Sequence, residues 1–457
     1  MENKVREYLL LSEQALAMRA VAIRLYNDLQ ARRRQGIPLR GEDLLVIQQG
    51  AADLLAQRDV LLALALEHEC WTHRPPEAGE AGDIQRAGVL ISLSAALTLY
   101  DNYLSAISLF RDDIRLRQLV NRGDKGFDVP ANALLRVDQM FASSKNRRRV
   151  RRAIQWRRQY AQVENSPFEG YAYLLRSIDQ SLFYYLVQQR RNPLSVLGSA
   201  FRMAGNVAVD VLSGLGKEGA YVSSFLFGNA AGLVETRRGK LERRPDVLEK
   251  AGGLLRAGDI LLEKTPFRLT DTFIPGHWGH AAVWVGGEEE LKALGIWDDP
   301  LLLPRQAEIR AGKSVAEALR SGVEMNTLAH FMNIDDLAIL RQPALSDDRR
   351  REIILQTLRQ VGKEYDFNFD AESTDRIFCS KLIYLVYGDI AWPTSRLLGR
   401  FTVSPDDIAR RALGDAALDI VLLYHDGELT DAPYADMAKF LGGQERQKAG
   451  DERREKK

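Results

Sequence analysis

The hydrophobic and polar positions of the chain follow two patterns, which change near residue 245. Over the first part, apolar side chains recur every three or four positions, as in amphipathic helices. The segments with this spacing are roughly 4–33, 41–72, 81–121, 130–163 and 168–191. Breakers such as Gly36 and Pro38 separate them, and Asp128 ahead of Pro130 predicts the start of the fourth helix. We therefore expect an all-α helical bundle at residues 1–245.

Beyond residue 250 the apolar runs become shorter and resemble strands bounded by turn residues. The runs lie at 259–262, 281–285, 337–340 and 418–424. Helical spacing returns at about 347–361 and 379–388, and Ser404 ahead of Pro405 predicts the start of a third helix. These patterns predict an α+β domain at residues 250–430, followed by a charged C-terminal tail at 431–457.

Composition narrows the class of protein. The 457 residues are 46% hydrophobic and 27% charged, which is ordinary for a folded globular chain, and the net charge is +1. This balance gives no general attraction to nucleic acid, which we do not expect as a partner. The two cysteines, Cys70 and Cys379, exclude a disulfide scaffold and a cysteine-rich metal site. The charged N-terminus lacks the features of a signal peptide, which predicts a cytoplasmic location.

Two segments of the helical part have a second interpretation as membrane contacts. Residues 145–158 carry eight basic side chains and no acidic one, and residues 192–234 are rich in Gly, Ala, Val and Phe. A basic run can contact anionic lipid head groups, and an apolar segment can lie in the membrane interface. We favour a solvated helix face for 145–158 and a buried helix pair for 192–234. Peripheral contact with a membrane through these two segments is the alternative.

Cys379 is the candidate nucleophile. Apolar residues at 382, 383, 386 and 387 form a helical stripe after it, which places the thiol at or near a helix N-terminus. The positive end of the helix dipole favours the thiolate there, and the free backbone N–H groups can receive an oxyanion. Lys381 adds a nearby positive charge. Cys70 has the pattern of a small packing residue within a helix and receives no role.

His280 is the histidine best placed to act with this thiol, because it opens the predicted strand 281–285. A third group must orient its imidazole. Glu317 lies in an alternating segment that predicts the next short strand, and Glu324 is the runner-up. His277 and His280 have the H-x-x-H spacing of a zinc pair, but no third ligand of matching spacing follows. No metal and no cofactor are therefore expected.

Five short segments occur in an order that resembles the YiiX/YebB-like branch of the NlpC/P60 superfamily. They are GDIL at 258–261, GHAAVWV at 279–285, VAEA at 315–318 with GV at 322–323, GKEYDF at 362–367 and FCSKLIY at 378–384. These relatives are circularly permuted papain-like cysteine hydrolases, in which the histidine strand precedes the cysteine helix. The lecithin:retinol acyltransferase-like proteins share that order. The resemblance covers residues 250–410, under half of the chain.

The resemblance implies roles for four residues. Cys379 corresponds to the nucleophile, His280 to the general base and Glu317 to the polar third member. Tyr365 corresponds to a tyrosine whose hydroxyl helps to bind the oxyanion. The chain departs from the compact family pattern at residues 290–314, which intervene between His280 and Glu317. This insertion is expected to form a lid or one wall of the cleft, and it leaves the choice between the two glutamates open.

The leading hypothesis is a cysteine hydrolase that forms an acyl-enzyme on an amide or an acyl ester, so its partner is a peptide or lipid substrate. The NlpC/P60 relatives imply peptide amides, whereas the acyltransferase-like relatives imply lipid esters. A lipid acyltransferase is thus one alternative. The others are a non-catalytic binding protein with a degenerate papain-like domain and a membrane-peripheral structural protein.

Overall fold

The computed structural model describes residues 1–161, 170–187, 237–266, 276–366, 369–397, 400–414 and 417–442. The chain divides into two compact units. One comprises residues 1–37 and 46–213, and the other comprises residues 38–45 and 214–457. Segment 192–234, interpreted from the sequence as a buried helix pair or a membrane contact, lies outside the described residues.

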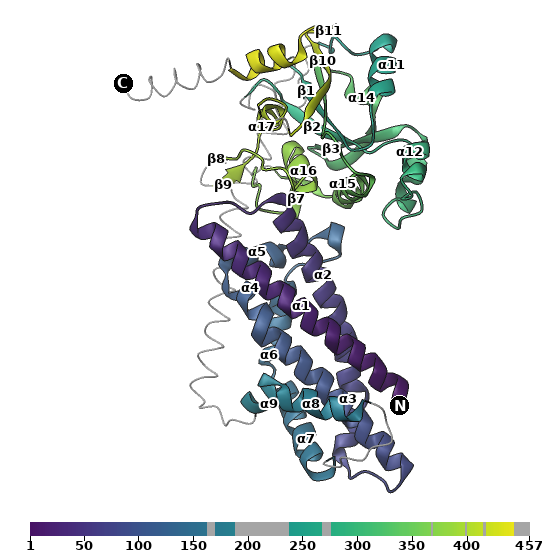
Figure 1. Cartoon of the computed structure of the whole chain (residues 1–457), viewed down its shortest axis with the longest axis vertical. Helices are drawn as coiled ribbons and strands as arrows, with labels where there is room; N and C mark the ends of the chain where they lie inside the picture. Colours follow the sequence, from purple (N-terminus) through teal and green to yellow (C-terminus); the bar gives the residue numbers. More distant parts are fainter. Residues whose placement is uncertain are drawn as a thin grey trace, which may run out of the picture. The chain divides into compact units, whose positions relative to one another are not determined.

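The N-terminal part of the chain is helical, as the spacing of its apolar residues predicts (Figure 1). Its α-helices are α1 Glu2–Arg34, α2 Gly41–Glu67, α3 Glu80–Asn102, α4 Ser108–Asp112, α5 Ile114–Arg122, α6 Ala133–Ala142, α7 Ser144–Tyr160, α8 Tyr171–Gln180 and α9 Leu182–Leu186. Short helical segments of other types connect some of them. These are the 3₁₀ helices η1 Glu69–His73 and η3 Lys125–Phe127, and the π-helix η2 Tyr103–Ile107. In α3 nearly every residue from Ala87 to Leu97 is buried, so this helix forms the centre of the helical unit.

Three of the predicted long helices are interrupted, each at a residue that caps the next helix. Asp113 accepts hydrogen bonds from the backbone N–H groups at the start of α5. Ser143 accepts one from Asn146 at the start of α7, and Ser181 accepts one from Tyr184 at the start of α9. These side chains satisfy backbone donors that a new helix leaves unpaired. Helical spacing continues on both sides of each break, which is why the pattern alone predicts one longer helix.

The predicted helix start at Asp128 is wrong. Asp128 has the left-handed backbone conformation, with φ of 55°, and follows the short turn η3. The helix α6 begins at Ala133, after Asn132. Asp124 and Val129 instead form an isolated antiparallel bridge, which holds the intervening residues in a closed turn. Proline at 130 therefore ends a turn and does not start a helix.

The basic run at 145–158 lies on α7, whose apolar face is buried in the helical unit. Trp156 is buried, and its indole N–H donates to the carbonyl of Arg74 at 2.8 Å. Arg149 and Arg152 both pair with Glu69, and Arg157 pairs with Asp179. Several of the basic side chains are thus paired within the unit, which supports the interpretation as a solvated helix face. Among the described residues, no helix is long and apolar enough to cross a membrane.

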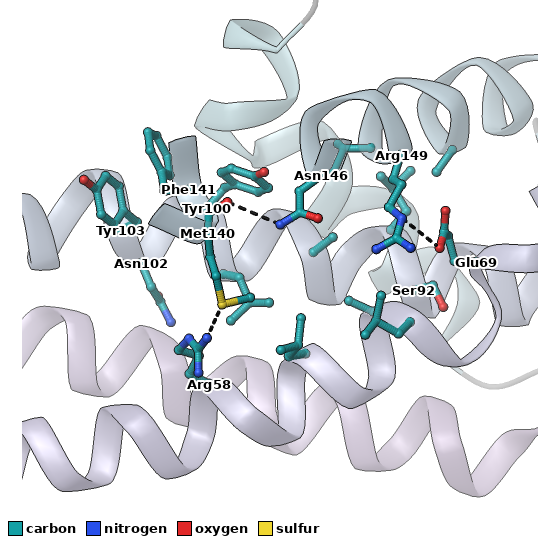
Figure 2. Close-up of a pocket in the computed structure, with 18 of the residues that line it drawn as sticks. Arg58, Glu69, Ser92, Tyr100, Asn102, Tyr103, Met140, Phe141, Asn146 and Arg149 are labelled. Carbon is teal, nitrogen blue, oxygen red and sulfur yellow. Dashed lines mark hydrogen bonds and ion pairs between the residues drawn. The ribbon is translucent and has the colours of Figure 1, made fainter. Parts of the chain in front are cut away.

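A pocket lies among the helices of this unit (Figure 2). Its walls come from α2, α3, α6 and α7 and are mostly aliphatic and aromatic. Polar groups occur at its rim, where Arg58 lies against Met140 and Arg149 pairs with Glu69. A second apolar pocket is lined mainly by α1, α2 and α6.

The second unit is built on a seven-stranded sheet with the order β11-β10-β5-β1-β2-β3-β4 (Figure 1). The strands are β1 Asp259–Lys264, β2 His280–Trp284, β3 Lys313–Leu319, β4 Gly322–Thr327, β5 Asp336–Arg341, β10 Asp419–His425 and β11 Glu428–Leu429. All neighbouring strands are antiparallel. The four strands expected from the sequence are all present, and so is the short one at Glu317.

Helices and two small strand pairs complete this unit. The helices are α11 Pro245–Leu254, α12 Glu288–Ala293, η5 Leu303–Arg305, α13 Gln306–Arg310, α14 Leu328–Phe331, α15 Asp347–Gln360, α16 Cys379–Val386 and α17 Pro405–Arg410. The strand pairs are β6 Glu364–Tyr365 with β7 Arg376–Ile377, and β8 Ser395–Leu397 with β9 Arg400–Thr402. The helix start at Ser404 has a complete capping box with Asp407, as the sequence predicts.

The insertion at 290–314 packs into a hydrophobic cluster that it shares with the sheet and α15. Its apolar side chains are buried together with Ala316 of β3 and Met325 of β4. Side chains alternate between the two faces of a strand, so Ala316 and Met325 point away from the face that carries Glu317. The insertion is therefore packed on the opposite face of these strands from Glu317 and does not cover that residue. Its role as one wall of the cleft stays a prediction.

The segment expected to be a charged tail begins as part of the domain. Residues 433–442 are helical, and Met437 and Leu441 are buried. The sulfur of Met437 accepts a hydrogen bond from the indole N–H of Trp278 at 3.3 Å. The expectation of a tail from residue 431 is thus corrected for 431–442, and residues 443–457 lie outside the described part of the chain.

Candidate active site

Cys379 and His280 are brought together by one strand and one helix. His280 is the first residue of β2, and Cys379 is the first residue of α16, with Phe378 as the N-cap. The thiol lies beside the imidazole of His280, close enough for each group to shift the pKa of the other. Both positions match the expectation from the sequence, a strand start for the histidine and a helix N-terminus for the cysteine.

Glu317 lies beside His280 on the neighbouring strand. It is directly opposite Ala282 in the β2–β3 ladder, and therefore on the same face as His280 two residues earlier. A carboxylate oxygen of Glu317 lies 2.9 Å from Nε2 of His280. The other oxygen accepts a hydrogen bond from the side-chain amide of Asn326 at 2.9 Å. Since Nε2 faces Glu317, Nδ1 is the ring nitrogen left for the Cys379 thiol.

The surroundings of Cys379 favour its thiolate. Burial alone would raise the pKa of the thiol, but the hydrogen bond and the charge of His280 hold the pKa of Cys379 below its ordinary value. The nearby backbone N–H groups of Ala281 and Ser380 lower the pKa further. Cys379 is only 4% exposed, so few water molecules compete with these donors.

The pKa of His280 is raised and the pKa of Glu317 is lowered, so both side chains favour their charged forms. Burial alone would lower the pKa of His280, yet its contacts with Cys379 and Glu317 raise that pKa well above its ordinary value. The pKa of Glu317 is lowered: burial raises it, but the hydrogen bond and charge of His280 and the amide of Asn326 outweigh burial. The three side chains thus favour a thiolate, an imidazolium and a carboxylate in contact.

Tyr365 lies near Cys379, and the negative charge of the thiolate affects the pKa of its phenol. Burial first, and then the Cys379 and Asp366 charges, raise the pKa of Tyr365 well above its ordinary value, while Arg320 lowers it. The phenol therefore stays protonated as a hydrogen-bond donor. Its backbone is paired in parallel with Ile377, two residues before the nucleophile. The tyrosine predicted from the resemblance is thus beside the thiol.

Lys381 does not act on the thiol as the sequence suggests. Its side chain is fully buried, and its ammonium group contacts Asp366 at 3.0 Å, Ser373 at 2.6 Å and the carbonyl of Arg376 at 2.7 Å. The carboxylate of Asp366 neutralises its charge, and the three acceptors together satisfy its three donors. Lys381 therefore ties the segment between Tyr365 and Cys379 to the first turn of α16, a structural role.

The loop before His280 is held by the carboxylate of Asp406 on α17. Asp406 accepts hydrogen bonds from the backbone N–H groups of His277 at 3.2 Å and Trp278 at 2.8 Å. A side chain at Gly276 would come within about 2.8 Å of that carboxylate, and the φ of this glycine is +138°. Glycine is thus required at 276 for the close approach, which fixes the entry of the chain into β2.

The runner-up, Glu324, lies opposite Glu317 on β4 and on the same face. Glu317, and not Glu324, contacts His280. Asn326, two residues beyond Glu324 on β4, donates a hydrogen bond to Glu317. Asn326 is not among the residues expected from the sequence, although strand alternation places it on this face. Arg320 is not among them either; it lies in the turn before β4 and faces Tyr365.

Cys70 is not the packing residue that the sequence suggested. It is exposed, and it lies in η1 after the end of α2. The helical pattern continues past Glu67, but the chain there tightens into a 3₁₀ turn that turns the thiol outward. The two cysteines therefore differ in both exposure and surroundings.

Comparison with known proteins identifies a family match for the C-terminal domain. Residues 254–431 match the model of a family described as permuted papain-like amidase enzymes, the YaeF/YiiX or C92 family. This confirms the resemblance and the α+β, permuted papain-like class of the C-terminal domain, and it supports a cysteine-type hydrolase of amide bonds. A search of the curated proteins and a search of the solved structures each found no significant match.

Proposed function

We propose that Cys379 and His280 hydrolyse amide bonds through an acyl-enzyme, with Glu317 as the third member and Tyr365 as an oxyanion donor. The observation that carries this proposal is the placement of Cys379 at the start of α16 beside His280, whose imidazole lies 2.9 Å from Glu317. In this arrangement the pKa of the thiol is lowered and that of the imidazole is raised. A preformed thiolate–imidazolium pair is the reactive state of a cysteine hydrolase.

The first half-reaction forms a thioester. The Cys379 thiolate attacks the carbonyl carbon of the amide, and the carbonyl electrons move to oxygen. The backbone N–H of Cys379, at the start of α16, and the hydroxyl of Tyr365 donate to this oxyanion. When the oxyanion collapses, the C–N bond breaks and the His280 imidazolium gives its proton to the departing amine.

The second half-reaction restores the enzyme. His280, now neutral, accepts a proton from water as the water oxygen attacks the thioester carbonyl. Collapse of this intermediate breaks the C–S bond and releases the carboxylic acid. Throughout, Glu317 accepts a hydrogen bond at Nε2 of His280, so it fixes the ring and stabilises its charged form.

The test is site-specific alkylation followed by mass spectrometry. Full-length protein is treated with iodoacetamide at pH 7, and the modified fraction of each cysteine is followed over time. Cys70 is exposed and serves as the internal reference for a thiol limited by its own reactivity. Cys379 is expected to react faster than free cysteine although it is buried, because it is held as thiolate.

A His280→Ala variant is the matched control. It should slow the alkylation of Cys379 and leave that of Cys70 unchanged. The proposal fails if Cys379 in the unaltered protein reacts no faster than free cysteine. It also fails if Cys379→Ala retains turnover of a peptide-amide substrate that the unaltered protein cleaves.

A further inference from the structure

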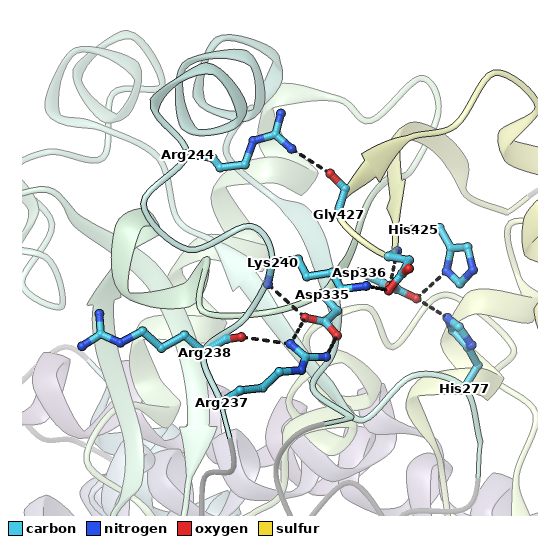
Figure 3. A network of polar contacts seen from close by, with 10 residues as sticks. Arg237, Arg238, Lys240, Arg244, His277, Asp335, Asp336, His425 and Gly427 are labelled. Atoms are coloured by element: carbon cyan, nitrogen blue, oxygen red, sulfur yellow. Dashed lines mark hydrogen bonds and ion pairs between the residues drawn. The ribbon is translucent and has the colours of Figure 1, made fainter.

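A second cluster of side chains, outside the Cys379 site, brings together groups suited to a metal ion (Figure 3). His277, Asp336 and His425 each offer one ligand atom, and these atoms lie within 4.8 Å of one another. They come from three separate segments: the loop before β2, the start of β5 and the end of β10. The sequence analysis found no third ligand for His277 because the partners lie far along the chain.

The three ligand atoms lie close together. Nε2 of His277 lies 2.8 Å from a carboxylate oxygen of Asp336, and Nδ1 of His425 lies 2.9 Å from the same oxygen. In a tetrahedral zinc site with bonds near 2.0–2.1 Å, ligand atoms are roughly 3.3 Å apart. The two N···O distances are thus about half an ångström shorter than in such a site, so the nitrogens would move away from the oxygen by about that much to admit an ion.

The side chains are also held in place by contacts around the cluster. The ring of His277 is stacked on Phe440 at a centroid distance of 4.3 Å, and that of His425 lies 4.5 Å from the same phenyl ring. The second oxygen of Asp336 accepts the backbone N–H of Asp426 at 2.7 Å. Such contacts orient ligands before a metal arrives, which reduces the ordering cost of binding.

We propose that His277, Asp336 and His425 form a binding site for a divalent transition metal, with Zn²⁺ as the first to test. Two imidazoles and one carboxylate suit Zn²⁺, whereas Mg²⁺ and Ca²⁺ prefer oxygen ligands. The side chain of His425 is 47% exposed, so solvent can reach the cluster and supply a fourth ligand. The site is separate from the proposed catalytic residues and does not depend on their role.

A metal here would connect the sheet to the loop that leads into the active site. His277 lies three residues before His280, and its backbone is already held by Asp406. Coordination would add a bond between this loop and the ends of β5 and β10. The expected effect of the metal is therefore a rise in thermal stability of the domain.

The first experiment measures Zn²⁺ binding to the full-length chain in the Cys379→Ala background, so that the active-site thiol cannot bind the ion. Protein freed of metal with a chelator is dialysed against Zn²⁺ and analysed by inductively coupled plasma mass spectrometry. One Zn²⁺ per chain is expected. His425→Ala and Asp336→Asn should each weaken binding by at least about tenfold, measured by competition with a chromophoric chelator.

His73→Ala is the matched control, because His73 is exposed in η1 of the helical unit. This variant should bind Zn²⁺ as the parent does. Absence of bound Zn²⁺ in the parent, or unchanged affinity in both His425→Ala and Asp336→Asn, would overturn the proposal. Circular dichroism of the metal-free variants checks that they are folded.

A second measurement needs no substitution in the cluster. Diethyl pyrocarbonate modifies accessible histidines, and the modified positions are mapped by mass spectrometry. Zn²⁺ should protect His425 and leave His73 unprotected. If Zn²⁺ binds but the modification of His425 is unchanged, the ion is held elsewhere and the proposal is rejected.

Discussion

Glu317 and His280 lie 37 positions apart in the chain, yet their side chains meet at 2.9 Å across two adjacent strands. The register of β2 and β3 sets this contact, because Glu317 is opposite Ala282 and shares its face with His280. The insertion between them changes the length of the connection and leaves this register intact. The contact between Glu317 and His280 therefore depends on the pairing of β2 with β3.

Replacing Glu317 by Gln should lower kcat for amide hydrolysis on the order of 10²–10⁴-fold, because the neutral amide stabilises the imidazolium less and permits the wrong tautomer. Steady-state kinetics on a peptide-amide substrate would measure the loss. Glu324→Gln is the matched control, since Glu324 lies opposite on β4. Equal losses in the two variants would contradict the assignment of Glu317.

The pH profile of Cys379 alkylation should be displaced to low pH. An unperturbed cysteine thiol has a pKa of about 8.5. Because the pKa of Cys379 is lowered, its thiolate persists below that pH and is lost only as the pH falls through the lowered pKa. Because the pKa of His280 is raised, its imidazolium persists above about 6.5.

The ion pair therefore occupies the window between the lowered thiol pKa and the raised imidazole pKa. Iodoacetamide rates measured across this range, with free cysteine as reference, would show it. In His280→Ala the midpoint should move upward, toward that of free cysteine. A profile for Cys379 that coincides with free cysteine in the unaltered protein would show that no such pair exists.

Tyr365→Phe removes a hydroxyl and keeps the ring. If this hydroxyl binds the oxyanion, kcat should fall by about 10²–10³-fold with little change in KM, since the interaction is made in the transition state. Alkylation of Cys379, which develops no oxyanion, should change far less. A rise in KM with unchanged kcat would instead indicate a role in substrate binding.

Lys381→Met should destabilise the domain by about 3–5 kcal/mol, because it leaves the buried carboxylate of Asp366 without its cation. Chemical denaturation followed by circular dichroism would measure this. Lys292→Met is the control: its ion pairs with Glu288 and Glu289 are exposed, so little change is expected. Similar stability of the two variants would refute the structural role of Lys381.

Local signals in the sequence predicted the positions of the central site residues. Apolar spacing after Cys379 predicted its place at a helix start, and alternation around Glu317 predicted a strand that carries it on the face of His280. Each of these features is encoded within about ten residues. The family match over 254–431 is consistent with them.

Long-range contacts could not be predicted in the same way. Lys381 was expected to influence the thiol, but its three buried acceptors come from a segment whose path the sequence does not specify. His277 meets Asp336 and His425 only after the sheet has assembled. Helix breaks at Ser143 and Ser181 escaped notice because apolar spacing continues across a capping residue.

The sulfur of Cys379 is contacted by two consecutive residues, through the imidazole of His280 and the backbone N–H of Ala281. One peptide unit thus sets both the base and a donor to the nucleophile. A displacement of α16 along β2 would weaken both contacts at once, and neither can be adjusted alone. Nucleophile and base are therefore aligned by a single strand–helix junction, and small packing changes behind that junction should alter reactivity without touching any reacting atom.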